Sequence, residues 1–483
     1  MDGEKQPLLP VETHTRLRES TSSKSWSLLR FSLVVASLLL LSAWNVALGR
    51  QVPQLSTQNV DGGDIQKYWA QYRPYTPMAE YAPPPKGCEV KQVSFAPHLP
   101  LQRHGARYPT ADDPPDFKQA IAKMQRADEF KDPRLNFLRN HSYFLGADDL
   151  VPLGAEQSFE AGMVAFSRYS SLVSGENLPF VRASGSERVV DSAMNWTAGF
   201  AVASRYKYLP SLSVVISEKS NDTLQNAMCP NVGSESKYLK TWRSVFLPNT
   251  TARLNAAAPG ADLNDEDAFK LMALCPLETV ALGVDLPKSD FCALFGEEEW
   301  EGFEYYGDLQ KYYRTGYGQE LGPVQGVGYL NELLARLMGK PVRDNTQTNH
   351  TLDSSPETFP LGRSVYADFS HENTMIAIYS AMGLFKQDKD LDPTALADEH
   401  GRTWIASRMV PFSARMVVEK LQCAKGKGRG LVKKEWVRVL VNDALQPLEF
   451  CGKGNGLCTL KKFVKSQSYA RHDGKGDWDK CFG

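Results

Sequence analysis

Hydrophobic residues recur along this chain at two different spacings, which predict alternating strands and helices. Alternating apolar and polar side chains, or short apolar runs, indicate strands, because successive side chains of a strand point to opposite faces. Apolar residues three and four positions apart indicate helices. Strands are predicted at residues 90–95, 212–218, 364–369 and 436–443, and helices at 154–169, 327–339 and 373–382. The order of these segments predicts an α/β fold.

The middle of the chain departs from this pattern. Between about residues 221 and 343 the strand-like runs disappear and helix-favouring stretches dominate. We therefore predict a mainly α-helical inserted domain at 221–343, within an α/β catalytic domain made of residues 88–220 and 344–483. Residues 49–87 are rich in Gln, Pro, Tyr and Gly, and they predict an extended stalk that precedes the folded part.

A hydrophobic segment lies close to the amino terminus. Residues 31–48 carry no charge, and their number is at the lower limit for crossing a bilayer. Four basic residues from Arg16 to Arg30 precede the segment, so a retained segment would be a type II transmembrane signal-anchor with residues 1–30 in the cytosol. Small residues also suit signal-peptidase cleavage after Gly49. Both alternatives stay open, and both place the rest of the chain in the secretory pathway, as a secreted, cell-surface or vacuolar protein.

Charge and cysteine content exclude some functions. Lysine and arginine number 55 against 56 acidic residues, and a net charge of -1 provides no general field for binding nucleic acid. The eight cysteines form no CxxC pair and no zinc-like spacing with histidine, which favours disulfides over a metal site. Five glycosylation sequences support an oxidising compartment. They lie at Asn140, Asn195, Asn221, Asn249 and Asn349.

The strongest local signal for chemistry is RHGARYP at residues 103–109. A phosphate monoester is a dianion, so a site that cleaves it needs fixed cations, and Arg103 and Arg107 place guanidinium groups on both sides of His104. Gly105 lets the backbone turn sharply beside a ligand. The segment therefore predicts an anion site in which His104 is the nucleophile.

A second candidate segment is ADFSHEN at residues 367–373, where a predicted strand passes into a helix. An alkoxide leaving group needs a proton, so a carboxylic acid is required near the ester oxygen. Glu372 is predicted to supply that proton, with His371 as a cationic donor beside the phosphate. Because an unperturbed Glu titrates near about 4.3, we expect an acidic activity optimum.

These motifs carry a family resemblance. RHGxRxP resembles the signature of the histidine acid phosphatases, and further stretches are similar to the fungal phytase branch of that family, which is 3-phytase-like. The similar stretches include GPVQGVGYLNELLARL, NHTLDSSPETFPL, VPFSARMVVEKLQC and GDWDKCFG, and they cover about residues 88 to 483. The resemblance implies a central, mostly parallel sheet flanked by helices, as in the phosphoglycerate mutases, with an inserted helical domain. The family usually has Asp where Glu372 stands, one methylene shorter.

The resemblance also implies partners for His104 and for the cysteines. Arg182, in FVRASGSERV, matches a third arginine of the family's phosphate clamp, whereas Arg188 on the following helix is expected to make structural contacts. The implied disulfides are Cys88 with Cys423, Cys229 with Cys481, Cys275 with Cys292, and Cys451 with Cys458.

Basic residues that hold a polyphosphorylated inositol at the rim of the cleft are also implied by the resemblance. They would fall at Arg134, Arg139 and Lys311, with Gln310 where a second lysine often stands. The neutral Gln310 would make the pocket less selective for phytate.

Together these features predict a two-step phosphomonoester hydrolysis without metal or cofactor. His104 attacks phosphorus to form a phosphohistidine while Glu372 protonates the departing oxygen, and water then attacks the phosphoenzyme. The expected partners are small phosphate esters, with phytate (myo-inositol hexakisphosphate) implied by the resemblance. Two alternatives remain: a broad-specificity acid phosphatase with little preference for phytate, and a weakly active phosphate-binding glycoprotein.

Overall fold

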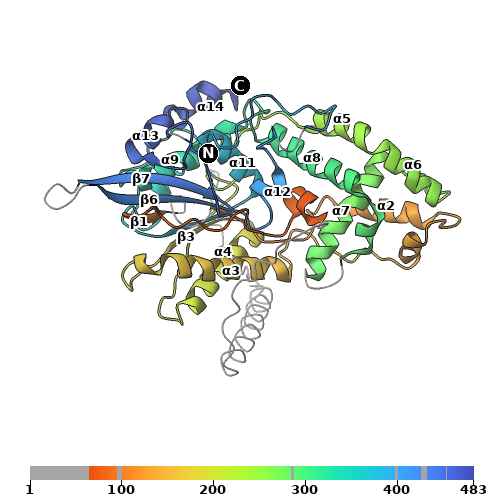
Figure 1. Cartoon of the computed structure of the whole chain (residues 1–483), viewed down its shortest axis with the longest axis horizontal. Coiled ribbons are helices and arrows are strands. Elements are labelled where there is room, and N and C mark those ends of the chain that lie inside the picture. Colours follow the sequence, from red (N-terminus) through yellow and green to blue (C-terminus); the bar gives the residue numbers. More distant parts are fainter. Residues whose placement is uncertain (1–64, 95–100, 284–287, 398–400, 426–431, 453) are drawn as a thin grey trace, which may run out of the picture. The chain divides into compact units, whose positions relative to one another are not determined.

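Strands from distant parts of the chain pair into one sheet in the computed structural model (Figure 1). The order is β4-β3-β5-β2-β6-β7-β8, with β1 paired to β6 and β9 to β7. The sheet is parallel over β4-β3-β5-β2 and antiparallel beyond, so that as a whole it is mixed. Its strands are β1 (Cys88–Ser94), β2 (Leu101–Arg103), β3 (Phe180–Ser184), β4 (Leu212–Ile216), β5 (Tyr366–Ser370), β6 (Arg415–Lys425), β7 (Val432–Val441), β8 (Ala444–Leu445) and β9 (Cys458–Thr459). The predicted α/β fold is confirmed.

The structure describes residues 65–94, 101–283, 288–397, 401–425, 432–452 and 454–483. The hydrophobic segment at 31–48 lies outside these residues, so the choice between anchor and cleaved signal stays a prediction. Among the described helices, none combines the length and the apolar character that a membrane span requires.

Helices follow most of the strands along the chain. They are α2 (Pro114–Gln125), α3 (Pro152–Tyr169), α4 (Glu187–Ala203), α5 (Ser236–Phe246), α6 (Pro248–Ala257), α7 (Asp265–Leu282), α8 (Glu297–Arg314), α9 (Val327–Met338), α10 (His350–Asp353), α11 (Glu372–Met382), α12 (Ala406–Met409), α13 (Leu460–Ser466) and α14 (Asp477–Lys480). The predicted helices at 154–169, 327–339 and 373–382 correspond to α3, α9 and α11 within two residues at each end.

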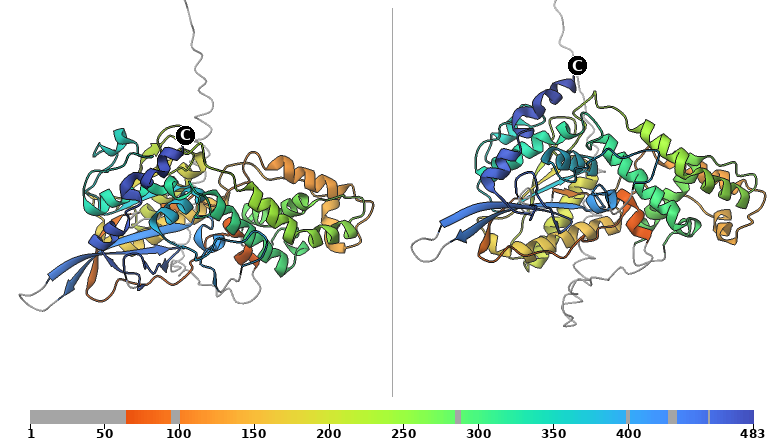
Figure 2. Two further views of the ribbon diagram at one scale, coloured as in Figure 1. Left: turned by 90° about the horizontal axis from the view of Figure 1, so that it is seen from above. Right: turned by 45° about the horizontal axis from the view of Figure 1, so that its top comes forward.

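Two helical layers enclose the parallel part of the sheet (Figures 1 and 2). α3 and α4 pack together on one face, where Trp196 and Phe200 of α4 meet Val181 and Phe369 of the sheet in a buried cluster. α9 and α11 lie on the other face. Because both faces are covered, the polar carboxyl ends of the parallel strands are where a site can form.

A group of helices extends beyond the sheet (Figures 1 and 2). α5, α6, α7 and α8 pack on one another and come from the stretch expected to be helical. α2 also packs on α7, although it lies outside residues 221–343. The boundaries of an inserted domain therefore stay a prediction, because the helical group draws on an earlier segment of the chain.

The start of the folded unit corrects the predicted stalk. Residues from Ile65 onward belong to one unit, and Trp69 is completely buried. The Ala70 amide donates to Glu304 over 2.6 Å, and Ser407 Oγ donates to the Lys67 carbonyl over 2.8 Å. The apolar aromatic residues of this segment gain free energy by burial, which the overall Pro- and Gln-rich composition concealed. Folding begins near residue 65 and not near Cys88; the remainder of the predicted stalk, 49–64, lies outside the described residues.

Four disulfides fasten segments far apart in the sequence. They are the four pairs that the family resemblance implied: Cys88–Cys423, Cys229–Cys481, Cys275–Cys292 and Cys451–Cys458. The first joins neighbouring strands β1 and β6 at paired positions. The second ties the last turn of the chain to the loop that precedes α5.

Candidate active site

Two neighbouring parallel strands bring the two predicted histidines together. β2 ends at Arg103 and β5 at Ser370, and these two residues are paired in register. His104 and His371 therefore leave the sheet at the same carboxyl edge, where the His104 amide donates to the Ser370 carbonyl over 3.0 Å. Their ring centroids are 5.8 Å apart. The topology thus juxtaposes residues that are 267 positions apart, by the difference of their numbers.

The loop after His104 is fixed by both helices of one layer. The Gly105 amide donates to Ser192 Oγ on α4 over 3.0 Å, and the Ala106 amide donates to Gln157 Oε1 on α3 over 3.1 Å. A Cβ atom on Gly105 would lie 2.0 Å from the carbonyl oxygen of Gly154. Gly105 is thus required for the close approach of the loop to α3, besides any freedom that it gives the turn.

His104 is held as a neutral base with one free nitrogen. Its ring is buried, and Nδ1 lies 2.9 Å from its neighbour's carbonyl oxygen, an atom that can only accept, so Nδ1 carries the proton. Burial lowers the pKa of His104 well below its usual value, and the positive charges of Arg103 and Arg107 contribute to this, against the opposing effect of Glu372. Nε2 is left with its lone pair, 3.6 Å from Glu372 Oε2. This is the protonation state that a nucleophilic imidazole needs.

Three arginines of this region have hydrogen-bond donors that are not used. Arg103 Nε donates to Glu372 over 3.1 Å, and its Nη1 donates to the carbonyls of Gln71 and Val410. Yet Nη2 of Arg103, Nε of Arg107 and Nε of Arg188 are buried and, within the described residues, have no acceptor. Each such donor costs about 1–3 kcal/mol if it stays unpaired. Buried donors of this kind favour the binding of an anion.

Glu372 lies between cations from two elements. Arg103 approaches Oε2, and Lys311 Nζ on α8 lies 3.6 Å from Oε1. Burial alone would raise the pKa of Glu372, but Arg103 and Lys311 outweigh it and hold the pKa well below the usual range. Burial lowers the pKa of Lys311 to about 8, although Glu372 acts against this. In this state of the enzyme, Glu372 is therefore a carboxylate.

Arg182 does not lie in this cluster. It is completely buried on β3, where its Nε donates to Asp368 over 2.8 Å and its Nη2 to Glu332 over 2.6 Å. Arg336 binds the same Asp368 over 2.6 Å. Arg182 and Asp368 are paired across β3 and β5, so the arginine is neutralised inside the fold. The assignment of Arg182 to the phosphate clamp does not fit this geometry, because two carboxylates already occupy its guanidinium.

Arg188, in contrast, interacts electrostatically with residues of the His104 cluster, and its Nη1 lies 3.5 Å from Asp148 Oδ1. It lies in the first turn of α4, directly after the carboxyl end of β3. Burial lowers the pKa of Arg188, and the charge of Arg107 lowers it further, whereas Glu372 raises it, so these groups share one electrostatic environment. The signal that could have found it is position: residues at a helix start just beyond a parallel strand face the site, whereas those in the middle of a strand are buried.

The three residues predicted at the rim differ in their surroundings. Lys311 is 2 % exposed and donates to Asn373 Oδ1 over 3.0 Å, so it belongs to the centre of the site and not to a solvated rim. Arg134 binds Asp132 over 2.7 Å and the carbonyl of Ala293, and the Arg139 guanidinium lies 4.7 Å from the centre of the Phe130 ring. Among the described residues, no hydrogen bond or ion pair links either arginine to the His104 cluster. Their rim role stays a prediction.

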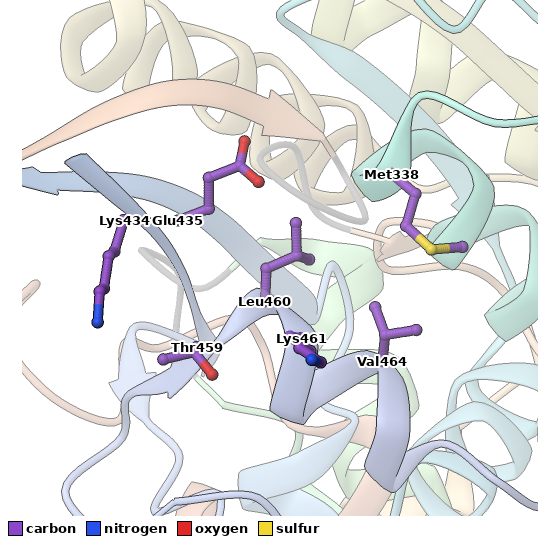
Figure 3. A pocket seen from close by; sticks show the side chains of 7 residues that line it. All are labelled: Met338, Lys434, Glu435, Thr459, Leu460, Lys461 and Val464. Carbon is purple, nitrogen blue, oxygen red and sulfur yellow. The ribbon is translucent and has the colours of Figure 1, made fainter. Parts of the chain in front are cut away.

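The surface pockets lie elsewhere. Figure 3 shows one of about 440 Å³ between the end of α9, β7 and α13, and none of the residues discussed above lines it. Its lining residues are Met338, Lys434, Glu435, Thr459, Leu460, Lys461 and Val464. Because its lining contains no histidine and no cluster of fixed cations, the pocket does not compete with the His104 cluster as a phosphate-ester site. Within the described part of the chain, no group of three or more His, Cys, Asp or Glu side chains is arranged to hold a metal ion.

The fold and this cluster define a class of protein. The family model of the histidine phosphatase superfamily (branch 2) matches residues 100–442, and the chain belongs to that family. A curated relative, Phytase A of Arthroderma benhamiae, is 41% identical over 432 residues, which cover 86% of this chain and 92% of the relative. Phytase A of Aspergillus fumigatus is 37% identical over 437 residues, with 86% and 90% covered. Among solved structures, the phytase from D. castellii superposes with a TM-score of 0.66 at 20% identity, over 87% of this chain and 90% of that one, which supports the fold.

Proposed function

We propose that this protein is a phytase of the histidine acid phosphatase type, which releases phosphate from phytate and related monoesters. The observation that carries the proposal is the neutral His104 Nε2 beside the buried guanidinium groups of Arg103 and Arg107, which, like the partly exposed Arg188, each retain a buried donor without an acceptor. A phosphoryl group has three equatorial oxygens that need such donors in the transition state. The relatives named Phytase A, at 37% and 41% identity, support the substrate.

The first chemical step forms a phosphohistidine. His104 Nε2 attacks phosphorus as the P–O bond to the alcohol breaks, and Glu372 gives its proton to the departing oxygen. Arg103, Arg107 and His371 stabilise the equatorial oxygens. We assign the remaining clamp position to Arg188, because its Nε has no acceptor whereas Arg182 is bound by Asp368 and Glu332.

Glu372 must gain a proton before it acts. In the free enzyme it is ionised by Arg103 and Lys311. A bound phosphate brings negative charge and competes for the same cations, which raises the pKa of the carboxyl group. Activity should therefore fall as pH rises through the pKa of Glu372 in the complex. We therefore expect an acidic optimum, although Glu372 is ionised in the free enzyme.

The second step returns the enzyme to its starting state. Glu372, now a carboxylate, takes a proton from water as the water oxygen attacks phosphorus. The P–N bond breaks, inorganic phosphate leaves, and His104 is again neutral. No proton is left over in this cycle, because Glu372 ends protonated as it began the first step.

The experiment that tests this function follows phosphate release from phytate by the purified enzyme across pH 3 to 8, in the presence of a chelator. We expect release at acidic pH and, after acid quenching of a reaction with labelled substrate, label on His104. A working enzyme that never carries the label would overturn the covalent mechanism. Loss of turnover on chelation would overturn the metal-free mechanism.

A broad-specificity acid phosphatase remains a second candidate, since a specific observation favours it. Gln310, where relatives often place a lysine, is neutral and accepts a hydrogen bond from Gln71 over 2.9 Å. A polyphosphorylated inositol would find fewer cations there. Parallel measurement of kcat/KM for phytate and for an aryl phosphate separates the two functions, because only a phytase should prefer the larger anion.

We also propose that the folded unit works in the lumen of the secretory pathway or outside the cell. The four disulfides need an oxidising compartment. Asn140, Asn221 and Asn249 are exposed, as glycan acceptors must be. The segment at 31–48 would act as a type II anchor or as a cleaved signal, and the molecular mass of the mature chain distinguishes these.

A further inference from the structure

Outside the reacting pair of His104 and Glu372, a second histidine and carboxylate pair lies at the same edge of the sheet. Glu218 follows β4 and His371 follows β5, and both strands pair with β3. His371 Nε2 lies 2.9 Å from Glu218 Oε1. The pair is largely but not fully buried, with 12% of the histidine side chain and 25% of the glutamate side chain exposed. This contact joins a residue of the proposed clamp to a carboxylate that has no role in the reaction described above.

We propose that Glu218 is a positioning residue that keeps His371 oriented and doubly protonated, so that this histidine serves as a cationic donor to the substrate phosphate. The proposal rests on the proposed function, because it assigns a role within the same phosphate site.

Glu218 is itself fixed in place by four donors. Besides His371, its Oε1 accepts from the Ser186 amide over 3.0 Å, from Ser186 Oγ over 2.7 Å and from Ser184 Oγ over 2.9 Å. Burial alone would raise the pKa of Glu218, but His371 and Ser186 lower it well below the usual range. A carboxylate held in this way stays charged across the acidic pH range in which the enzyme is expected to work.

The hydrogen bond to Glu218 determines which nitrogen of His371 is left to donate to a phosphate. A carboxylate can only accept, so Nε2 of His371 must carry a hydrogen, and Nδ1 is the only other donor position on the ring. In the neutral ring Nδ1 would present a lone pair, which repels a phosphate oxygen. His371 can therefore donate to phosphate only as an imidazolium, and a charged neighbour such as Glu218 favours that form.

Other charged groups also surround His371. His104 faces it from the loop after β2, Glu372 follows it in α11, and Arg188 in α4 shares an electrostatic environment with Glu218. Asp222 lies behind Glu218 and accepts from Ser184 Oγ over 2.7 Å. Burial raises the pKa of Asp222 to about 7, so this carboxyl group is mostly uncharged at acidic pH. Glu218 is therefore the carboxylate in direct contact with His371 that stays charged there.

Glu218→Gln tests the proposal, because it keeps the shape and an accepting oxygen but removes the charge. We expect the pH at which kcat/KM begins to fall to move down by about 1 unit, since an opposite charge in contact shifts a pKa by at least that amount. Above this pH, the inhibition constant of inorganic phosphate should be about tenfold higher in the variant than in the wild type. Near pH 4, where an ordinary imidazole is protonated in any case, the two inhibition constants should be similar.

Asp222→Asn is the matched control, because it changes a carboxyl group in the same network that does not touch His371. Its pH profile should follow that of the wild type. The ring resonances of His371, assigned from the spectrum of His371→Gln, give a direct measurement: in Glu218→Gln the histidine should lose its proton at lower pH than in the wild type.

A double-mutant cycle separates positioning from a general structural role. If Glu218 acts through His371, adding Glu218→Gln to His371→Gln should change kcat/KM little, and the two effects should not multiply. Multiplicative effects, or a uniform loss at all pH values with unchanged titration of His371, would overturn the inference while leaving the enzyme a phosphatase. Absence of phosphate release by the wild type would instead overturn the proposed function.

Discussion

Two groups of buried cationic side chains lie at neighbouring positions in this fold, and they differ in the number of carboxylates that face them. Arg182 and Arg336 meet Asp368 and Glu332, so two positive charges face two negative charges. Around His104, in contrast, Arg103 and Lys311 converge on a single carboxylate, Glu372, and Arg107 adds a further positive charge that acts on His104. The charges of the first group balance within the protein, whereas the second group holds more positive charges than carboxylates.

This difference shows that charge balance, and not residue type, separates a structural arginine from a binding one. A buried ion pair with both partners present is satisfied, but removal of one partner leaves a costly charge. A cluster with excess donors already carries that cost and recovers it on binding. The two groups should therefore respond in opposite ways to substitution, the first in stability and the second in activity.

The largest effect should come from His104→Ala at the centre of the second group. Loss of the nucleophile removes the covalent route, so phosphate release should fall by more than about 10⁴-fold. Fixed-time assays measure the rate of phosphate release. After acid quenching of a reaction with labelled substrate, the variant should carry no label. A loss of less than tenfold would contradict nucleophilic catalysis by this residue.

Breaking the first group should lower stability. Asp368→Asn leaves Arg182 and Arg336 without a shared carboxylate, and the free energy of unfolding should drop by about 3–5 kcal/mol. Burial raises the pKa of Asp368, but Arg182 and Arg336 together hold it below the ordinary value. A depressed folded pKa means that this stability exists above about pH 4 and is lost as pH falls through the folded value. Urea unfolding should thus show a gap between wild type and variant that narrows below pH 4.

A surface pair serves as the control for that experiment. Glu320 and Lys480 form an exposed ion pair at 3.0 Å. Glu320→Gln should leave the unfolding midpoint unchanged, because exposed pairs contribute little. A variant Asp368→Asn that is as stable as wild type at pH 6 would show that the network is not needed for folding.

Removing one arginine of the second group should reduce activity without reducing stability. Arg107→Ala eliminates a donor to the transition state, and kcat/KM should fall by about 10²–10³-fold. The same change removes a buried unpaired donor, so the thermal midpoint should stay the same or rise. Arg182→Ala is the comparison variant, in which a large loss of stability is expected. If Arg107→Ala lowers the thermal midpoint as much as Arg182→Ala does, the proposed difference between the two groups is wrong.

The smallest effect concerns the position of the pH optimum. Lys311 lowers the pKa of Glu372, so Lys311→Met should raise it and keep Glu372 protonated to higher pH. The alkaline fall of kcat should therefore move upward by about 1 pH unit. A downward movement would contradict the role of Glu372 as the acid. Glu218→Gln should instead move the alkaline fall of kcat/KM to lower pH, so the two variants together separate the roles of the two carboxylates.

Local patterns predicted much of the fold and the centre of the site. The strands and helices with regular spacing, such as α3 and α11, were predicted within a few residues, and the RHGARYP segment located His104, Arg103 and Arg107. The strand β6 was not predicted. Its Glu419 and Lys420 interrupt the apolar pattern, yet Glu419 is completely buried because it pairs with Arg438 across β6 and β7.

The other differences between the sequence-based predictions and the structure depend on partners that are distant in the sequence. The burial of Arg182 depends on Asp368, 186 residues later, and on Glu332, and neither partner can be identified from the sequence around Arg182. Lys311 looks like a surface residue in sequence but is buried beside Glu372. Family resemblance supplied the disulfide pairing, which spacing alone could not have chosen.

The segment at residues 65–72 links the beginning of the folded unit to the chemistry at its centre. The Gln71 carbonyl and the Val410 carbonyl together hold Nη1 of Arg103. A chain that began at the first strand would lack the Gln71 carbonyl and would therefore lose one of these two restraints, together with the buried Trp69. Purification tags therefore belong upstream of Ile65.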